Sequence, residues 1–254
     1  MSGSQVVREI DGRGAEGNVD ELVRARFFPT QISGLMVEVG AANPDHLSIS
    51  ALYRSLGWTV VAIEPNPEFC ELHRQRGHAV LQYACGDHDE DHVDFTIVDS
   101  HGAAYRDESI SYESFSSLAL KDSYADLVGS DVTMRKIKVD LRRLDTLLTQ
   151  HAPEVERIDV LTIDVEGWEL EVLDGFDMTR FAPRVMVIEN FFAERAYRDY
   201  MRARGYGLWR YVEPNDVYVA AEELSAGDKV SRARARLSLR GRQLSGGLSS
   251  RLRR

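Results

Sequence analysis

The sequence predicts an α/β fold with a doubly wound, mostly parallel sheet. Three short apolar runs, Leu35–Val39, Thr59–Ile63 and 158–163, are rich in β-branched residues. Each is followed by small or acidic residues and then by a helical pattern. Such runs are typical of buried parallel strands, and their alternation with helices is typical of βαβ units. We expect one large domain, over residues 18–223.

The N-terminal part begins with a polar, Gly-rich stretch, residues 1–17, which we expect to be a flexible arm. A short helix is predicted over residues 19–28, with Asn18 or Asp20 near its N-cap. After the first strand come Gly40 and two alanines, a turn that lets the backbone approach a ligand closely. Asn43 and Pro44 then favour the start of a helix that runs to about residue 56.

The second strand ends at Glu64, which lies 24 residues after Gly40. This offset is close to the roughly 20 residues at which a strand-end acid meets a ribose in nucleoside-binding βαβ units. A third strand is predicted over residues 79–84, and Asp87 follows it, where an acid could reach an exocyclic amine. The pattern is not GxGxxG, and nothing resembles GxxxxGK[ST], so phosphate binding is disfavoured.

Carboxylates also follow two later strands. Asp164, Glu166 and Gly167 follow the strand at 158–163, and Glu189 and Asn190 follow a strand predicted over residues 185–188. A capping role for the first two acids is the simpler alternative to a ligand role. Trp168 comes next and is more typical of core packing than of ligand stacking. A helix over residues 191–204, then an antiparallel hairpin over 209–212 and 217–220, would complete the domain.

Residues 99–130 change character and are rich in Ser, Asp, Glu and Tyr, with no steady period. An insertion of this length is usually functional or disordered. We interpret it as an acceptor-binding lid, with a surface loop as the alternative. Its aromatic residues could stack on a substrate; they are Tyr105, Tyr112, Phe115 and Tyr124.

The net charge of −10 does not suggest a nucleic-acid enzyme, and 43% hydrophobic residues fit a soluble globular protein. Two cysteines, no signal pattern and no long apolar run favour a cytoplasmic protein. The tail at 224–254 holds nine basic residues from Lys229 onward and no acid after that point. It could be disordered, bind an anionic membrane surface peripherally, or contact a protein or a second copy. The oligomeric state stays open.

Several motifs together resemble the FkbM family of S-adenosylmethionine-dependent O-methyltransferases, which have a class I Rossmann-like fold. They cover roughly residues 35–220 in the family's order, and the DVEG element is the most specific. The first motif departs from the family pattern at Ala42 and Pro44. The matching stretches are EVGAAN at 38–43, AIEPNP at 62–67, ACGD at 84–87, SSL at 116–118, VDLRRLDTLL at 139–148, IDVLTIDVEGWELEVLDG at 158–175 and VMVIEN at 185–190.

The resemblance implies a site for S-adenosylmethionine. Glu64 would hold the ribose hydroxyls, Asp87 would lie near adenine, and Asp164 would lie close to the methyl donor. The other residues implied on the cofactor side are Glu38, Gly40, Ala41, Asn43 and Pro65.

Two mechanisms for deprotonating an acceptor hydroxyl stay open. Asp164, Glu189 and Asn190 offer hard oxygen ligands suited to Mg²⁺, an arrangement similar to that of catechol-type O-methyltransferases. In the metal-free alternative, Asp164 or Glu166 acts as the base and Glu189 orients the substrate. His101, in the insertion, is a further candidate base.

These observations favour an O-methyltransferase acting on a hydroxyl of a sugar, a glycolipid or a polyketide-type natural product. The alternative is a degenerate, nucleoside-binding scaffold of the same fold, which the altered turn at Ala42 and Pro44 keeps open. An NAD-dependent dehydrogenase is disfavoured because GxGxxG is missing.

Overall fold

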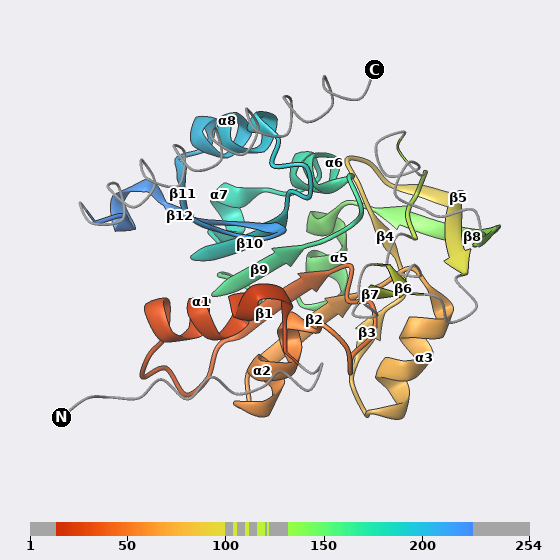
Figure 1. The fold of residues 1–254 in the computed structure, drawn as a ribbon, viewed down its shortest axis with the longest axis horizontal. Coiled ribbons are helices and arrows are strands. Elements are labelled where there is room, and N and C mark those ends of the chain that lie inside the picture. Colours follow the sequence, from red (N-terminus) through yellow and green to blue (C-terminus); the bar gives the residue numbers. More distant parts are fainter. Residues whose placement is uncertain are drawn as a thin grey trace, which may run out of the picture.

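The computed structural model describes residues 14–99, 104–105, 110–111, 116–119, 121 and 132–225. Its centre is a seven-stranded sheet (Figure 1). The spatial order is β11 (Tyr206–Val212), β12 (Asn215–Ala220), β10 (Val185–Glu189), β9 (Val160–Ile163), β1 (Leu35–Val39), β2 (Thr59–Ile63) and β3 (Val80–Leu81). The five strands from β10 to β3 are parallel, whereas β12 is antiparallel to both its neighbours. The mostly parallel sheet and the antiparallel hairpin predicted from the sequence are therefore confirmed.

Helices cover both faces of this sheet (Figure 1). Side chains alternate along each strand, so Val185 and Val187 pack on one face and Met186 and Ile188 on the other. The first face is covered by α1 (Val19–Phe27) and α2 (Ile49–Ser55). The second face is covered by α5 (Leu144–His151), α6 (Glu169–Asp174), α7 (Met178–Phe181) and α8 (Arg195–Ala203), while α3 (Pro67–Gln75) follows β2.

A three-stranded sheet adjoins the main one and is made of β4 (Ala84–Cys85), β8 (Thr133–Arg142) and β5 (Glu90–Asp99). The sequence predicts one strand over residues 79–84, but the chain forms β3 and β4 in two different sheets. The insertion connects the end of β5 to the start of β8, where Asp99 pairs with Thr133. The described part of the insertion also holds a small two-stranded sheet, β6 (Ala104–Tyr105) and β7 (Ile110–Ser111).

The packed domain begins before residue 18. Residues 16–18 form a 3₁₀ helix, η1 (Glu16–Asn18), and Ala15 is buried against α1. A Cβ on Gly17 would meet the Val212 side chain of β11 at 2.5 Å, so η1 packs closely on the C-terminal hairpin. The arm predicted over 1–17 is therefore too long at its C-terminal end. Another 3₁₀ helix, η3 (Ala221–Glu223), follows β12.

Two helices start later than the sequence suggests. α2 begins at Ile49 rather than at Pro44. The Asn43 side chain accepts a hydrogen bond from the Asp45 amide, as an N-cap does, but Leu47 has a φ of +53°, so a helix cannot continue through this segment. α8 begins at Arg195 rather than near 191, since residues 190–194 form a turn that the Asn190 side chain holds.

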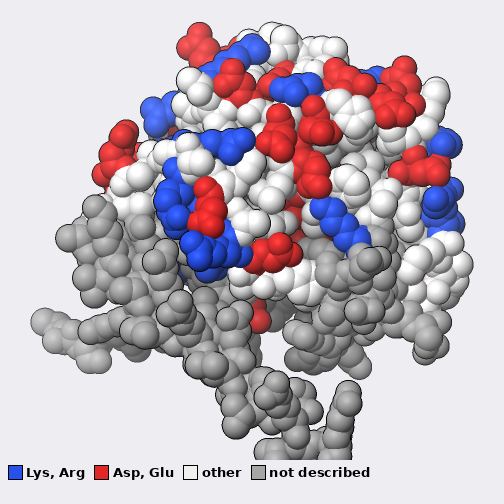
Figure 2. Space-filling model, turned by 90° about the horizontal axis from the view of Figure 1, so that it is seen from above, with Lys and Arg blue, Asp and Glu red and all other residues white. Residues whose placement is uncertain are grey.

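Figure 2 shows acidic and basic side chains interspersed over the described part of the face seen from above. Ion pairs between neighbouring surface residues include those of Arg202 with Asp199 and of Arg204 with Asp174. None of the described helices is long and apolar enough to cross a membrane. The basic tail after residue 225 lies outside the described residues.

Candidate active site

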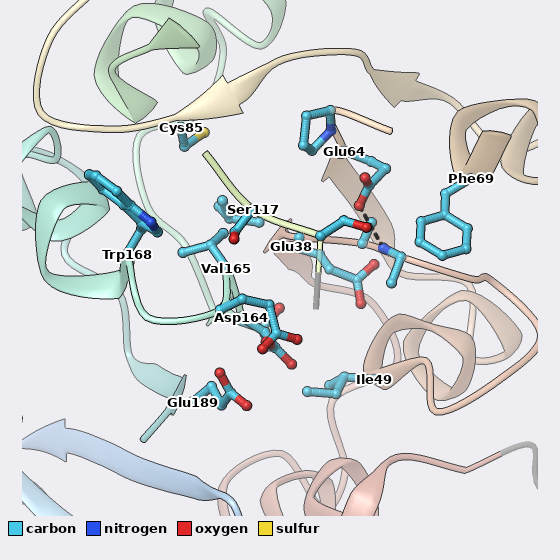
Figure 3. Close-up of a pocket in the computed structure, with 18 of the residues that line it drawn as sticks. Glu38, Ile49, Glu64, Phe69, Cys85, Ser117, Asp164, Val165, Trp168 and Glu189 are labelled. Carbon is cyan, nitrogen blue, oxygen red and sulfur yellow. Dashed lines mark hydrogen bonds between the residues drawn. The ribbon is translucent and has the colours of Figure 1, made fainter. Parts of the chain in front are cut away.

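A cavity opens at the carboxyl ends of β1, β2, β9 and β10, the edge at which open α/β sheets bind ligands (Figure 3). Most of the residues singled out from the sequence line it: Glu38, Gly40, Ala41, Asn43, Glu64, Pro65, Asp164, Glu166 and Glu189. These residues lie far apart along the chain, and the parallel register of the strands brings them together.

The turn after β1 is packed against the turn after β9. Gly40 has a φ of +80°, and a Cβ at this position would lie 1.7 Å from the backbone oxygen of Asp164. Only glycine fits both the dihedral angle and the contact. Gly40 therefore lets two strand ends of the cavity approach each other.

Glu64 lies at the end of β2 and is only 5% exposed. Its Oε2 accepts a hydrogen bond from the Ala42 amide at 2.8 Å, and its Oε1 accepts one from the Asn66 amide at 2.7 Å. His73 lies against the carbonyl of Ala42 at 3.1 Å, so the turn that departs from the family pattern is held from two sides. Each oxygen of Glu64 keeps a lone pair for a ligand hydroxyl. Burial raises the pKa of Glu64 to about 7.

Three carboxyl groups converge beside the strand ends. Asp164, Glu166 and Glu189 each offer an oxygen atom, and these atoms lie within 4.8 Å of one another. In Figure 3, Asp164 and Glu189 point toward the same part of the cavity. Strand parity explains the convergence, because Glu189 shares the sheet face of Val187, and Asp164 follows β9 on that same face.

Two more acids line the same cavity. Glu38 of β1 shares the sheet face of Met36, and its Oε1 accepts a hydrogen bond from the Ser50 amide. Glu16 of η1 comes from the segment that the sequence assigns to the flexible arm. Nothing in the local pattern around Glu16 indicates this position, which depends on the packing of η1 against β11.

Burial and mutual repulsion raise the pKa values of these acids. Burial, then the charge of Glu169, raises the pKa of Asp164 to about 8. Burial and the charge of Asp164 also raise the pKa values of Glu166 and Glu189 well above the usual range. Burial raises the pKa of Glu38 to about 7. The group therefore retains protons near neutral pH unless a cation compensates its charge.

The DVEG loop, residues 164–167, is held by a buried acid that is not among the described residues lining the cavity. Glu169 is fully buried, and its Oε1 accepts hydrogen bonds from the amides of Val165 and Gly167, both at 3.0 Å. Its Oε2 accepts a hydrogen bond from the Tyr197 hydroxyl at 2.6 Å. These bonds fix the backbone on both sides of Glu166. Glu169 therefore positions the loop, a role that the sequence analysis does not assign to it although it belongs to the DVEGWE motif.

The described part of the insertion reaches the cavity. Ser116, Ser117 and Leu118 line it, and Ser117 is paired with Thr96 of β5. Trp168 also lines the cavity rather than lying in the core, and its indole N–H donates to the carbonyl of Ala119. The insertion and the DVEG loop therefore share one wall.

Two of the predicted site residues that the structure describes do not join this group. The Asp87 carboxylate is 55% exposed and pairs with His88, and Asp87 is not among the described residues that line the cavity. The Asn190 amide donates to the Glu194 carbonyl and to Asp216, so it serves the turn before α8 instead of a metal. His101 lies outside the described residues.

Comparison with known proteins identifies the class. The fold and the cavity are those of an α/β protein with a strand-end ligand site, and the model of the methyltransferase FkbM domain matches residues 38–208. That match covers more than half of the chain, so the chain belongs to the FkbM methyltransferase family, which confirms the resemblance seen in the motifs. A 48-residue stretch is 48% identical to methyltransferase sdnD of Sordaria araneosa and covers 16% of this chain and 18% of that protein.

Proposed function

We propose that this protein is an S-adenosylmethionine-dependent O-methyltransferase with a class I methyltransferase fold. The single observation that carries the proposal is the cavity at the carboxyl ends of the parallel strands, with buried Glu64 on one side and the cluster of Asp164, Glu166 and Glu189 on another. The strand order, with antiparallel β12 between β10 and β11, supports the class I assignment.

The residues present fit the methyl donor. The close packing of Gly40 against Asp164 leaves no side chain between the two strand ends. Glu64 has free lone pairs for a ribose diol, and Phe69 offers an apolar surface in the same cavity. When bound, S-adenosylmethionine supplies a methyl group on a positively charged sulfur. The acidic lining suits such a cation, because none of the described residues that line the cavity is Lys or Arg.

The carboxyl cluster supplies a base that accepts the proton of the acceptor hydroxyl. A hydroxyl becomes a better nucleophile when a nearby base takes its proton, and a base works best with a pKa near the working pH. Asp164, with its pKa raised to about 8, meets this condition. A cationic ligand in the cavity lowers the pKa values of the cluster and frees a carboxylate to accept the proton.

The same charges restrict the acceptor. Five acidic side chains line the cavity: Glu16, Glu38, Asp164, Glu166 and Glu189, in addition to Glu64 on the ribose side. An acceptor with a phosphate or carboxylate close to the reacting hydroxyl would be repelled. We therefore propose a neutral hydroxyl acceptor, such as that of a sugar, a glycolipid sugar or a polyketide alcohol. We assign its binding to the insertion at 99–130, since Ser116–Leu118 line the cavity.

The test is transfer of a labelled methyl group from S-adenosylmethionine to a panel of neutral sugars, glycolipids and polyketide alcohols. We expect transfer to at least one class, and its loss in Asp164→Asn with donor binding retained. Binding of the donor without transfer to any class would favour the alternative of a nucleoside-binding scaffold. Absence of donor binding would refute the proposal.

A further inference from the structure

The carboxyl cluster has the spacing of a metal site. One oxygen each from Asp164, Glu166 and Glu189 lies within 4.8 Å of the other two. Oxygen ligands lie about 2.0–2.1 Å from Mg²⁺, so two ligands of one ion are separated by at most about 4.2 Å. A single cation between the three oxygens would draw the more distant of them together from the observed spacing of up to 4.8 Å.

One member of the cluster has an oxygen that nothing in the described structure satisfies. Glu166 is only 7% exposed, and its Oε2 is buried without a hydrogen-bond partner among the described residues. Glu166 lines the cavity, so this oxygen belongs to the wall that a ligand would touch. A buried carboxylate oxygen without a partner is costly, which points to a ligand that the fold expects there.

A second unpartnered oxygen lies on the same cavity. Glu38 is 5% exposed, and its Oε2 also has no partner among the described residues. Figure 3 shows its carboxyl group beside that of Asp164, and the two groups interact electrostatically. Arg54 acts on Glu38 and His46 acts on Glu16, but no described Lys or Arg lines the cavity. The described residues that line the cavity therefore supply no Lys or Arg to neutralise the carboxyl cluster when it is ionised.

We propose that Asp164, Glu166 and Glu189 bind one divalent cation of the hard, oxygen-preferring class, Mg²⁺ or Mn²⁺. The three ligands are carboxylates without a His or Cys, which favours these ions over Zn²⁺ or Cu²⁺. Three protein ligands leave positions open toward the cavity. Such a cation would hold the acceptor hydroxyl at an open position and lower its pKa. The proton would pass to a carboxylate of the cavity that is not a ligand, such as Glu38. The hydroxyl oxygen would form the bond to the methyl carbon while the carbon–sulfur bond breaks and its electron pair stays on the sulfur.

The role of this cation in catalysis rests on the proposed function, but cation binding itself does not. Mn²⁺ is the probe, because its binding can be followed by the loss of the free-ion signal in electron paramagnetic resonance. We would titrate the full chain at pH 8 with Mn²⁺, with and without S-adenosylhomocysteine, and compare wild type with Glu166→Gln and Glu189→Gln. Asp94→Asn is the matched control, since Asp94 is an exposed carboxylate paired with Lys136 and Lys138.

We expect one saturable Mn²⁺ site per chain, competed by Mg²⁺ and unchanged in Asp94→Asn. Each glutamine variant should weaken Mn²⁺ binding by at least about tenfold. Retained binding of S-adenosylhomocysteine in these variants shows that the fold and the donor side are intact. Glu64→Gln provides the reverse control, in which Mn²⁺ binding stays and S-adenosylhomocysteine binding weakens.

Two outcomes would overturn the cation site. In the first, wild type shows no saturable Mn²⁺ binding, either with or without S-adenosylhomocysteine. In the second, the glutamine variants bind Mn²⁺ as tightly as wild type. If S-adenosylhomocysteine still bound in those experiments, the proposed methyltransferase would stand and the cluster would act as a metal-free base. Loss of S-adenosylhomocysteine binding with Mn²⁺ binding intact would instead contradict the proposed function alone.

Discussion

A Cβ atom on Gly40 would lie 1.7 Å from the backbone oxygen of Asp164. This contact joins the turn after β1, on the donor side of the cavity, to the strand end that carries the carboxyl cluster. Two parts of the proposed site are therefore positioned by one backbone contact. A change at Gly40 should disturb both at once.

We expect Gly40→Ala to lower the free energy of unfolding by more than about 3 kcal/mol, because it adds a clash to the strain of a positive φ. Gly57→Ala is the matched control: Gly57 has a φ of +79°, and a Cβ there meets nothing within 4 Å. It should cost only about 1 kcal/mol. Urea unfolding measures the free energy of unfolding of both variants. Equal losses in the two variants would show that the contact with Asp164 does not matter.

The bond between Glu169 and Tyr197 should contribute to stability because both groups are buried. We expect Tyr197→Phe to lower the free energy of unfolding by about 1–3 kcal/mol, since a buried carboxyl oxygen loses its hydrogen-bond donor. Tyr200→Phe is the control, because the Tyr200 hydroxyl also donates to a carboxylate at 2.6 Å, that of Asp174, but at an exposed site. Urea unfolding should show a much smaller loss of free energy of unfolding for Tyr200→Phe than for Tyr197→Phe. The reverse order would contradict the account of the DVEG loop.

The hydrogen bonds of Asn190 favour a structural role in the turn before α8 over a role as a metal ligand. Its Oδ1 accepts from the Glu194 amide at 2.7 Å, and its Nδ2 donates to the Glu194 carbonyl and to buried Asp216. We expect Asn190→Ala to cost about 2 kcal/mol in urea unfolding and to leave Mn²⁺ affinity unchanged in the folded protein. Weaker Mn²⁺ binding with unchanged stability would restore Asn190 as a ligand.

The buried acids Glu38 and Glu64 contribute to the pH dependence of stability, in the same direction as the carboxyl cluster. Burial raises the pKa of each from 4.5 to about 7, so the folded protein binds more protons than the unfolded chain between these values. Stability should therefore be fully present below about pH 4.5, as far as these groups are concerned, and fall as the pH rises to about 7. Each group contributes on the order of 3 kcal/mol to this fall.

The measurement is the free energy of unfolding of the ligand-free protein at several pH values, in a buffer containing a chelator. Glu38→Gln should flatten the fall between pH 5 and 7, because glutamine does not titrate. The control is Glu68→Gln, because Glu68 is exposed and pairs with Arg135. This variant should show the same dependence of stability on pH as wild type. A profile that rises over this range in wild type would contradict the assignment of raised pKa values to these buried acids.

The sequence predicts the strands that build the site and the acids at their ends, because apolar runs and strand-end carboxylates are local features. It also contains the parity that places Glu189 and the Val187 side chain on one sheet face. It does not predict Glu16, whose position depends on the packing of Gly17 against Val212, almost 200 residues away. The sequence also does not predict the structural role of Asn190, because its hydrogen-bond partner Asp216 lies 26 residues further along the chain.

The most direct test of the central claim is calorimetric titration with S-adenosylhomocysteine of wild type, Glu64→Gln and Glu68→Gln. Glu64 is buried in the cavity, whereas the Glu68 side chain on the same segment is 67% exposed and pairs with Arg135. We predict one-to-one binding by wild type, at least about tenfold weaker binding by Glu64→Gln, and no change in Glu68→Gln. Absence of binding by wild type, or equal affinities in all three proteins, would contradict the central claim.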